Sequence, residues 1–162
     1  MPKFLMTERT NDWRKVPSRL GAGSGAANNV DDKEVGKFVK LIGDSQHNLC
    51  AVGDDIEGWI IAVEAATADA FSMGTVACGG YKEVTFDGLQ ATPGTGTINV
   101  NDYVLCGTVV AKGTALSGPA RVVSATTQAN AKASPFAARV VSRGSAGSGA
   151  VNTTGLIEHI NK

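Results

Sequence analysis

The stretch Val35–Glu64, VGKFVKLIGDSQHNLCAVGDDIEGWIIAVE, consists of short apolar runs separated by turn residues. The runs VGKFVKLI, NLCAV and IEGWIIAVE are rich in β-branched and aromatic residues, and glycine and aspartate stand between them. Short runs with this composition and punctuation are typical of β-strands, and no sustained 3.6-residue apolar period is present. The stretch therefore predicts an all-β chain.

The same pattern continues through the rest of the chain. Further strand-like runs occupy residues 75–79, 81–86, 97–100, 103–111, 120–126, 136–142 and 155–160. About ten strands at this spacing predict a jelly-roll-like antiparallel β-sandwich. Only residues 127–134 have the alanine content of a short helix. Most of the 20 glycines are expected in turns, because glycine adopts positive φ without steric penalty.

The apolar strand positions predict one core between two sheets, with Trp59 near its centre. The side chains expected in this core are Val35, Val39, Leu41, Trp59, Ile61, Val63, Val84, Phe86, Val104, Val109, Val122, Val140 and Ile157. An alternative interpretation places Trp59 at the surface as a contact for a partner.

The first 29 residues differ from the rest of the chain. They fit neither a helical nor a strand period, and they end in the glycine-rich sequence GAGSGAANN (21–29). We therefore expect residues 1–29 to form an extended, flexible N-terminal arm and residues 30–162 to form a single all-β domain. Within residues 1–20, five basic residues stand against two acidic ones, so this arm carries positive charge.

Overall charge and cysteine content exclude several classes of protein. The chain has 15 basic and 15 acidic residues, so no global field draws it to nucleic acid or to a membrane. The three cysteines are odd in number and lack metal-binding spacing, which predicts reduced, mostly buried thiols. The N-terminus lacks a signal-peptide core, and the longest apolar run, Trp59–Val63, is too short to span a bilayer. We expect a soluble protein made in a cytoplasm.

A glycine-rich loop at residues 144–155 follows a predicted strand and invites comparison with phosphate-binding loops. It lacks the order of a dinucleotide-binding G-x-G-x-x-G turn, because another strand rather than a helix follows it. The single Gly-Lys pair, Gly36-Lys37, precedes Phe38 rather than the serine or threonine of a P-loop. The loop is therefore predicted to connect two strands and to bind no phosphate.

The remaining polar groups form no recognisable catalytic or metal-binding motif. His47 and His159 are the only histidines, and neither belongs to an H-x-x-H pair, so both are predicted to be ordinary surface or hydrogen-bonded residues. Asp54, Asp55 and Glu57 could hold a cation, but they lack the spacing of a calcium loop and are interpreted as a turn. The sequence predicts no catalytic, cofactor-binding or metal-binding residues, no cofactor and no enzyme.

The stretch GKFVKLIGDSQHNLCAVGDDIEGWIIAVEAATADAFSMGTVACGG (36–80), with the later TINVNDYVLCGTVVAKGTA and FAARVVSRGSAGSGAVNTTGLIEHI, resembles capsid decoration, or cement, proteins of tailed phages. The likeness covers about residues 30–160 and is nearest to the small cement proteins of podophage heads. The resemblance implies a β-rich structural virion protein, without cofactor or reaction, seated on the outer surface of an HK97-type head. Such a protein would be synthesised in the cytoplasm of the bacterial host.

The partners implied by the resemblance are the major capsid protein and a second copy of the chain. Pairing of exposed sheet edges favours a homodimer on the capsid. The arm is expected to become ordered only on the shell, where it gains contacts at the cost of its own entropy. Within the arm, Trp13 would be an apolar anchor, or would fold back on its own domain, and the basic residues Arg9, Arg14, Lys15 and Arg19 would contact acidic capsid surface.

Two alternatives to a decoration protein remain. One is a ligand- or receptor-binding β domain on a virion surface. The other is an enzyme that resembles dUTP pyrophosphatases, because RGSAGSGAVNTTG (143–155) is similar in composition to the phosphate loop of that family. The stacking aromatic of that loop is missing here, however, and a further strand follows it.

Overall fold

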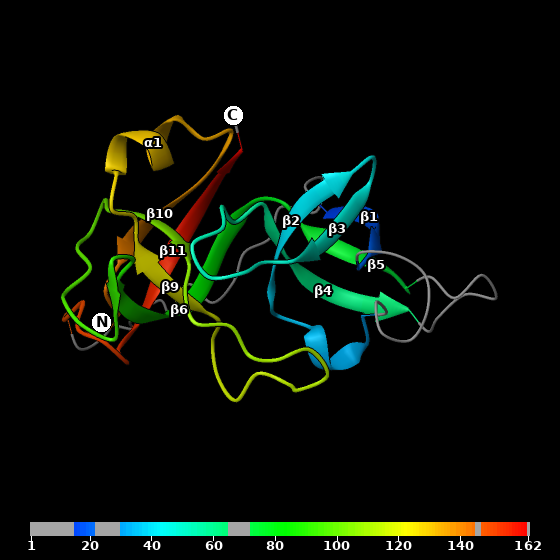
Figure 1. Cartoon of the computed structure of the whole chain (residues 1–162), viewed down its shortest axis with the longest axis horizontal. Coiled ribbons are helices and arrows are strands. Elements are labelled where there is room, and N and C mark those ends of the chain that lie inside the picture. The colour runs from blue at the N-terminus through cyan, green and yellow to red at the C-terminus, as the bar shows by residue number, and fades with distance from the viewer. Residues whose placement is uncertain (1–14, 22–29, 65–71, 145–146, 162) are drawn as a thin grey trace, which may run out of the picture.

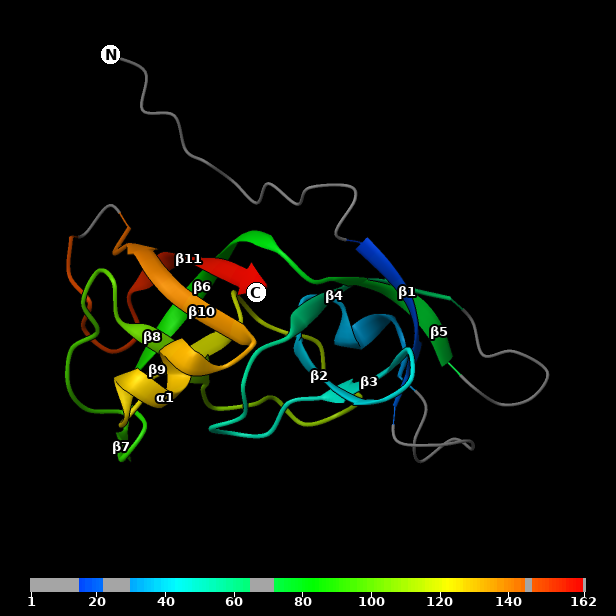
Figure 2. The ribbon, with the colours of Figure 1, turned by 90° about the horizontal axis from the view of Figure 1, so that it is seen from above.

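A computed structural model describes residues 15–21, 30–64, 72–144 and 147–161. Its strands form two sheets that lie side by side along the long axis of the molecule (Figures 1 and 2). The first sheet contains β1 (Lys15–Leu20), β2 (Phe38–Gly43), β3 (Gln46–Leu49), β4 (Gly58–Glu64) and β5 (Ser72–Ala77). The second contains β6 (Gly80–Leu89), β7 (Thr92–Pro93), β8 (Tyr103–Cys106), β9 (Arg121–Ser124), β10 (Phe136–Ser142) and β11 (Thr154–Asn161). A 3-10 turn, η2 (Asp32–Glu34), and a short helix, α1 (Gln128–Ala133), complete the described elements.

The first sheet is a closed barrel with the strand order β1-β3-β2-β4-β5. Strand β1 closes it by pairing antiparallel with β5, from Lys15 opposite Ala77 to Leu20 opposite Ser72. On its other side β1 pairs in parallel with β3, with Leu20 opposite His47. Closure leaves no open sheet edge in this barrel, which is one way in which β proteins avoid edge-to-edge association.

The second sheet has the order β11-β10-β8-β9-β6-β7, and an additional pairing between β11 and β6 joins its ends. Strand β6 is the longest, and it pairs antiparallel with β11 and in parallel with β9. The five strands β6, β11, β10, β8 and β9 therefore form a second closed ring, with β7 attached at its margin. Only two residues separate β5 from β6, so the chain passes almost directly from one ring to the other.

One buried apolar cluster extends across both sheets. Trp59 of β4, 2% exposed, belongs to the same cluster as Phe86 of β6 and Ile157 of β11, both 0% exposed. Lys82 of β6 is itself buried, and its ammonium lies 5.4 Å from the centre of the Trp59 ring, a cation–π contact between the sheets. The prediction of Trp59 as a core residue is confirmed, and the alternative of a surface Trp59 is wrong.

The all-β class is confirmed, as is the short helix predicted at residues 127–134. The jelly-roll detail is not established by this strand order, which contains two parallel pairs and two closed rings. Residues 97–100 form no strand, since only Thr97 bridges to Ala150. The strand predicted over residues 103–111 ends at Cys106.

The predicted single core is divided, because Val39 and Val63 pack in a second cluster apart from Trp59. Most of the predicted core side chains are nevertheless at least partly buried. The exceptions are Val35, Leu41 and Val109, which are 40%, 46% and 45% exposed. Ile61 and Val63 are partly buried against the core clusters. Val35 ends η2, Leu41 lies where β2 leaves the barrel, and Val109 lies in the long loop after β8, so none of the three has a sheet packed over it.

The predicted boundary of the arm at residue 29 is wrong for residues 15–20. These residues form β1, and within it Leu20 is fully buried and Ser18 is 1% exposed. The pairing of β1 with β5 and β3 makes it a structural part of the barrel. Gly21 is also described. The rest of the predicted arm, residues 1–14 and 22–29, lies outside the described residues.

The two helical segments in the described ranges, η2 and α1, are three and six residues long, too short to cross a bilayer.

The central position of Trp59 gives a first prediction. Trp59→Ala should lower the free energy of unfolding by about 3–5 kcal/mol, because it removes a large buried aromatic side chain from the shared cluster. Urea denaturation followed by circular dichroism measures the change. Val52→Ala, at a side chain that is 49% exposed, is the matched control and should change stability by no more than about 0.5 kcal/mol. Equal stabilities for the two variants would contradict the packing.

Candidate functional site

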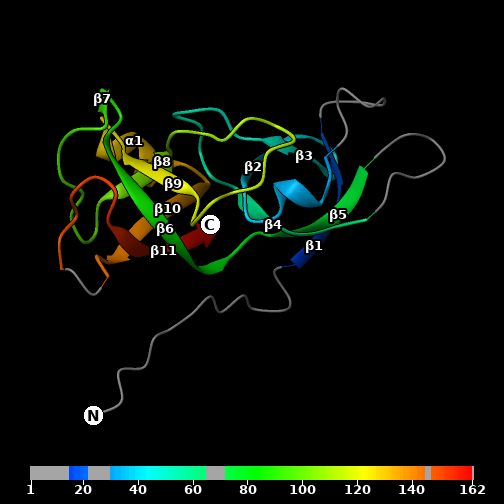
Figure 3. The same ribbon diagram turned by 90° about the horizontal axis from the view of Figure 1, so that it is seen from below.

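The loop at residues 107–120 connects β8 to β9 and extends from the second sheet to the first barrel (Figures 1 and 3). We call it the bridging loop. Its two ends are bound by β6 of the second sheet, and its middle contacts η2 and Lys37 beside the first barrel. The loop therefore fixes the two sheets relative to each other and encloses the space between them.

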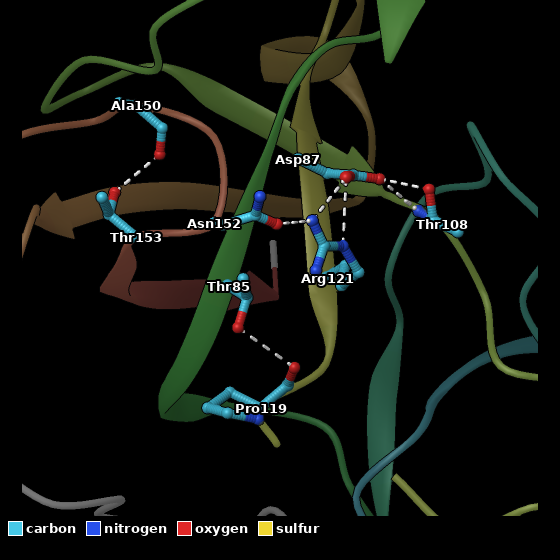
Figure 4. A network of polar contacts seen from close by, with 8 residues as sticks. All are labelled: Thr85, Asp87, Thr108, Pro119, Arg121, Ala150, Asn152 and Thr153. Atoms are coloured by element: carbon cyan, nitrogen blue, oxygen red, sulfur yellow. Dashed lines mark hydrogen bonds and ion pairs between the residues drawn. The ribbon is translucent and has the colours of Figure 1, made fainter. Parts of the chain in front are cut away.

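A polar network centred on Asp87 of β6 holds both ends of the bridging loop (Figure 4). The Asp87 carboxylate accepts hydrogen bonds from the backbone and hydroxyl of Thr108, at the start of the loop, the backbone bond measuring 2.9 Å. Its other oxygen accepts from Nε and Nη2 of Arg121, just after the loop, at 3.0 and 2.8 Å. Arg121 Nη2 also donates to Asn152 Oδ1 at 2.6 Å, which ties in the glycine-rich loop.

The environment of Asp87 favours its charged form. Burial is the largest single influence and would raise the pKa of this carboxyl, but the hydrogen bonds from Thr108 and Arg121 together outweigh it. The net effect is a pKa below the ordinary aspartate value. Asp87 therefore acts as an ionised anchor for the loop.

A buried ion pair receives the middle of the bridging loop. Glu34 of η2 is 0% exposed and Lys37 is 6% exposed, with 3.2 Å between Glu34 Oε1 and Lys37 Nζ. The loop supplies the remaining partners, since Lys37 Nζ donates to Ala111 O at 3.0 Å and Gly113 N donates to Glu34 Oε1 at 2.6 Å. A buried pair is stable only when such further hydrogen bonds satisfy its charges, so η2 and the loop depend on each other.

A cavity of about 220 Å³ lies beneath the bridging loop. Its walls come from residues in or beside the first barrel, from the loop itself, and from the ends of β8 and β9 in the second sheet: Lys37, Phe38, Leu49, Cys50, Cys106, Thr108, Val109, Val110, Ala111, Lys112, Leu116, Ala120 and Arg121. A hydrogen bond with Cys106, followed by burial, raises the pKa of the Cys50 thiol well above its ordinary value. Cys50 is therefore a protonated thiol and a poor nucleophile.

All three cysteines are free and buried, which confirms the prediction made from their number and spacing.

The glycine-rich loop packs against protein backbone and side chains along much of its length. A Cβ at Gly149 would lie 1.6 Å from Ile98 O, and one at Gly155 would lie 2.2 Å from the Phe86 ring. The loop backbone also pairs with β6, where Phe86 N donates to Thr153 O at 2.9 Å and Phe86 O accepts from Asn152 N at 2.8 Å. Glycine at these positions permits close packing, as expected for a connector between β10 and β11.

A second cluster of buried polar side chains lies inside the first barrel. Its residues come from β1 and β3 and from the positions next to β4 and β5. His47 Nδ1 lies 2.6 Å from Ser18 Oγ, and His47 Nε2 lies 3.4 Å from Glu57 Oε1. Cys78 completes a group in which the ligand atoms of His47, Glu57 and Cys78 all lie within 4.8 Å of one another. These three residues are 2%, 7% and 7% exposed.

His47 is hydrogen-bonded, as predicted, and the fold also brings Glu57 and Cys78 beside it, which the sequence did not predict. Strand pairing places Leu20 of β1 beside His47, and Gly58 lets β4 approach β5, since a Cβ there would lie 2.3 Å from Ala77 O. His159 also matches the prediction, because its Nε2 lies 2.7 Å from Ile56 O. No local motif in the sequence could have joined residues 47, 57 and 78.

Of the three acidic residues interpreted as a turn, Asp54 closes a turn with Ala51, as expected, whereas Glu57 is buried immediately before β4. Asp54 Oδ2 accepts from Ala51 N at 2.7 Å and pairs with Lys40 Nζ at 2.6 Å. Asp55 accepts a hydrogen bond from Ser134 Oγ at 2.9 Å.

The predicted shell-contact residues are only partly described. Arg9, Trp13 and Arg14 lie outside the described residues. Lys15 and Arg19 both lie on β1, where Lys15 is exposed and Arg19 is half-buried. The sequence prediction placed them on a mobile arm, whereas pairing with β5 fixes both in the barrel wall.

The β2–β3 hairpin is the most exposed apolar part of the barrel. Residues 41–45 are exposed on both strand faces, and they include the adjacent side chains Leu41 and Ile42, 46% and 45% exposed. The turn of the hairpin lies against β1, where Arg19 N donates to Ser45 O at 2.9 Å. The same barrel carries Val16, which is 36% exposed. We call residues 41–45 the projecting hairpin.

Comparison with known proteins yields no match to a family model, a curated protein or a solved structure.

The Asp87 network gives a second prediction. Asp87→Asn should lower the free energy of unfolding by about 1–3 kcal/mol at pH 7, because it weakens charged hydrogen bonds to Arg121 and Thr108. A carboxyl whose pKa is lowered by folding stabilises the folded protein at pH values above the pKa that it has in the unfolded chain, about 3.9. This stabilisation is lost as the pH falls through the lower pKa of the folded state. The difference between wild type and variant should therefore persist down to about pH 4 and shrink below it.

Urea denaturation over a pH series measures this difference. Asp44→Asn, in the exposed turn of the projecting hairpin, is the matched control and should stay within about 0.5 kcal/mol of wild type. A difference for Asp87→Asn that grows as the pH falls below about 4 would contradict the role of Asp87 as an ionised anchor.

Proposed function

We propose that the chain is a structural protein that binds the outer surface of an HK97-type phage head as a capsid decoration protein and stabilises contacts between major capsid subunits. The proposal begins with the resemblance of residues 36–80 and the later glycine-punctuated strands to phage cement proteins. It requires a surface that can bind another protein and a framework rigid enough to hold that surface in place.

The observation that carries the proposal is the projecting hairpin. A register shift interrupts the pairing of β2 with β3 between Leu41 and Gly43, and both Leu41 and Ile42 are exposed there, while Ser45 at the turn is hydrogen-bonded to β1. Single exposed apolar side chains are normal in soluble proteins. Leu41 and Ile42 are neighbours, and together they form a small exposed apolar patch that a capsid subunit could cover.

The exposed start of β1 adds a second contact region on the same barrel. Lys15, Val16 and Pro17 are exposed, and the chain leads from them to residues 1–14, which hold Arg9, Trp13 and Arg14. The hairpin would supply apolar contact with a capsid subunit, and this basic segment would meet acidic capsid surface. Rim charges of this kind govern partner choice and association rate more than affinity.

The ligand-binding alternative would use the cavity beneath the bridging loop. That cavity is about 220 Å³, below the roughly 300–1,000 Å³ that is common for small-molecule sites. Its charged groups Lys37 and Arg121 are also engaged in internal contacts. These observations favour shell binding over ligand binding.

A third prediction tests the projecting hairpin. The double variant Leu41→Asp, Ile42→Asp should melt like wild type but should lose occupancy on heads that lack the decoration protein, because charge replaces the apolar contact. Sedimentation of the heads followed by quantification of bound protein measures occupancy. Val52→Asp, at a side chain 49% exposed in the turn after β3, is the matched control and should bind fully. Full occupancy by the double variant would contradict the proposed surface.

A fourth prediction tests the N-terminal segment. Deletion of residues 1–14 should leave the barrel folded, because β1 begins at Lys15, and should weaken binding to heads in a salt-dependent way. Deletion of residues 1–20 would confuse binding with folding, since it removes β1 from its pairing with β5. Unchanged occupancy of the 1–14 deletion at low and high salt would show that this segment makes no contact with the shell.

A further inference from the structure

We propose that His47, Glu57 and Cys78 form a binding site for a zinc-type divalent cation inside the first barrel. The inference concerns a group separate from the projecting hairpin and does not depend on the proposed function. It rests on the identity of the three ligand atoms, on their distances, and on the hydrogen bonds that orient two of them.

The hydrogen bonds of Ser18 are compatible with a His47 ring that carries its proton on Nδ1. A serine hydroxyl has one hydrogen, and Ser18 Oγ has two backbone acceptors for it, Ser45 O at 2.9 Å and Arg19 O at 3.2 Å. When the hydrogen points to either of them, the Ser18 oxygen accepts from His47 Nδ1, 2.6 Å away. In the neutral ring this leaves a bare lone pair on Nε2, the form in which imidazole binds metals.

That lone pair is aimed at electron-rich groups. His47 Nε2 lies 3.4 Å from Glu57 Oε1 and has no hydrogen-bond partner within the described ranges. A nitrogen lone pair facing a carboxylate is repulsive unless a positive charge lies between them. The positive charge is supplied either by a proton on Nε2, which then points to Glu57, or by a metal ion.

The third ligand is the observation that favours a metal ion. Cys78 Sγ lies within 4.8 Å of both His47 and Glu57, and a thiol contributes nothing to an imidazolium–carboxylate pair. Nitrogen, sulfur and carboxylate oxygen together are the donor set of protein zinc sites, which bind at about 2.0–2.3 Å in tetrahedral geometry. Two ligands at about 2.05 Å in a tetrahedron are about 3.3 Å apart, so the 3.4 Å between Nε2 and Oε1 already matches one edge.

Charge balance also fits a divalent ion. Binding replaces the thiol proton, Cys78–SH + M²⁺ → Cys78–S⁻–M²⁺ + H⁺, so the thiolate and the Glu57 carboxylate cancel the two positive charges. A neutral site is compatible with burial, whereas an unbalanced one is not. Without a metal, burial and the nearby Glu57 charge raise the pKa of Cys78 to about 11, so metal affinity should rise with pH as the proton becomes easier to displace.

The supporting contacts have the form found around established metal ligands. Ser18 orients the imidazole, and Leu41 N donates to Glu57 Oε2 at 2.6 Å, which leaves Oε1 directed toward His47. Contacts of this kind fix ligand orientation, and their removal typically lowers metal affinity by about 10- to 100-fold. Ser18 is therefore a positioning residue, and three protein ligands leave one coordination position for water.

Cobalt(II) titration of the chelator-treated, reduced full-length chain tests the site. We expect one Co²⁺ per chain with a sulfur-to-cobalt charge-transfer band, displacement of cobalt by Zn²⁺, and a higher melting temperature with Zn²⁺ bound. Cys78→Ser should abolish the band, and Ser18→Ala should weaken binding about 10- to 100-fold. Cys106→Ser, at another buried free thiol, is the matched control and should retain the band.

Absence of a charge-transfer band in wild type with excess cobalt would overturn the proposal, as would a band that survives Cys78→Ser or disappears in Cys106→Ser. If Cys78→Ser does not fold, alkylation of wild type in moderate urea decides the matter. Zn²⁺ should then slow labelling of Cys78 more than labelling of Cys50 and Cys106. Equal protection of all three thiols, or none, would count against the site.

Discussion

The shared apolar cluster is the constraint on which the rest of the structure depends. Two small closed rings meet end to end, and Trp59 from one ring is buried in a single cluster with Phe86 and Ile157 from the other. The shared cluster adds buried apolar surface to the separate cluster that the first barrel forms around Leu20 and Ile60. The buried Lys82 over Trp59 adds a polar contact at the same junction. The bridging loop is anchored at two places. Asp87 binds it from the second sheet, and the Glu34–Lys37 pair binds it from beside the first barrel.

The rigid junction relates directly to the proposed function. Decoration of a shell requires that a binding surface be held in a fixed orientation, because ordering a mobile surface on binding costs free energy. Closed sheets present few edges for unwanted pairing, so an exposed feature such as the projecting hairpin stands out as a contact. A metal ion held by His47, Glu57 and Cys78 would stiffen the same barrel, since its ligands come from three separate segments of the chain. The proposed binding surface and the proposed metal site would then belong to the same barrel.

Local patterns in the sequence predicted the β class, the helix near residue 130, strand β10 in full, and the burial of Trp59, because these follow from composition and alternation over a few residues. They failed where long-range pairing decides the outcome. Strand β1, KVPSRL, buries only Ser18 and Leu20 and includes a proline, so its strand state depends on β5. Val109 resembles a strand residue but lies in a loop held by Asp87 and Glu34. The His47 group joins residues far apart in sequence, and the likeness to cement proteins carries no information about it.

Native-state hydrogen exchange on the full chain tests most directly whether the shared cluster makes the two rings one cooperative unit. If it does, the slowest amides of β4 and β5 in the first barrel and of β10 and β11 in the second sheet should converge on one free energy of opening as denaturant rises. If amides of the first barrel instead open at a distinctly lower free energy while β10 and β11 stay protected, the two rings unfold independently, and the shared cluster does not couple them.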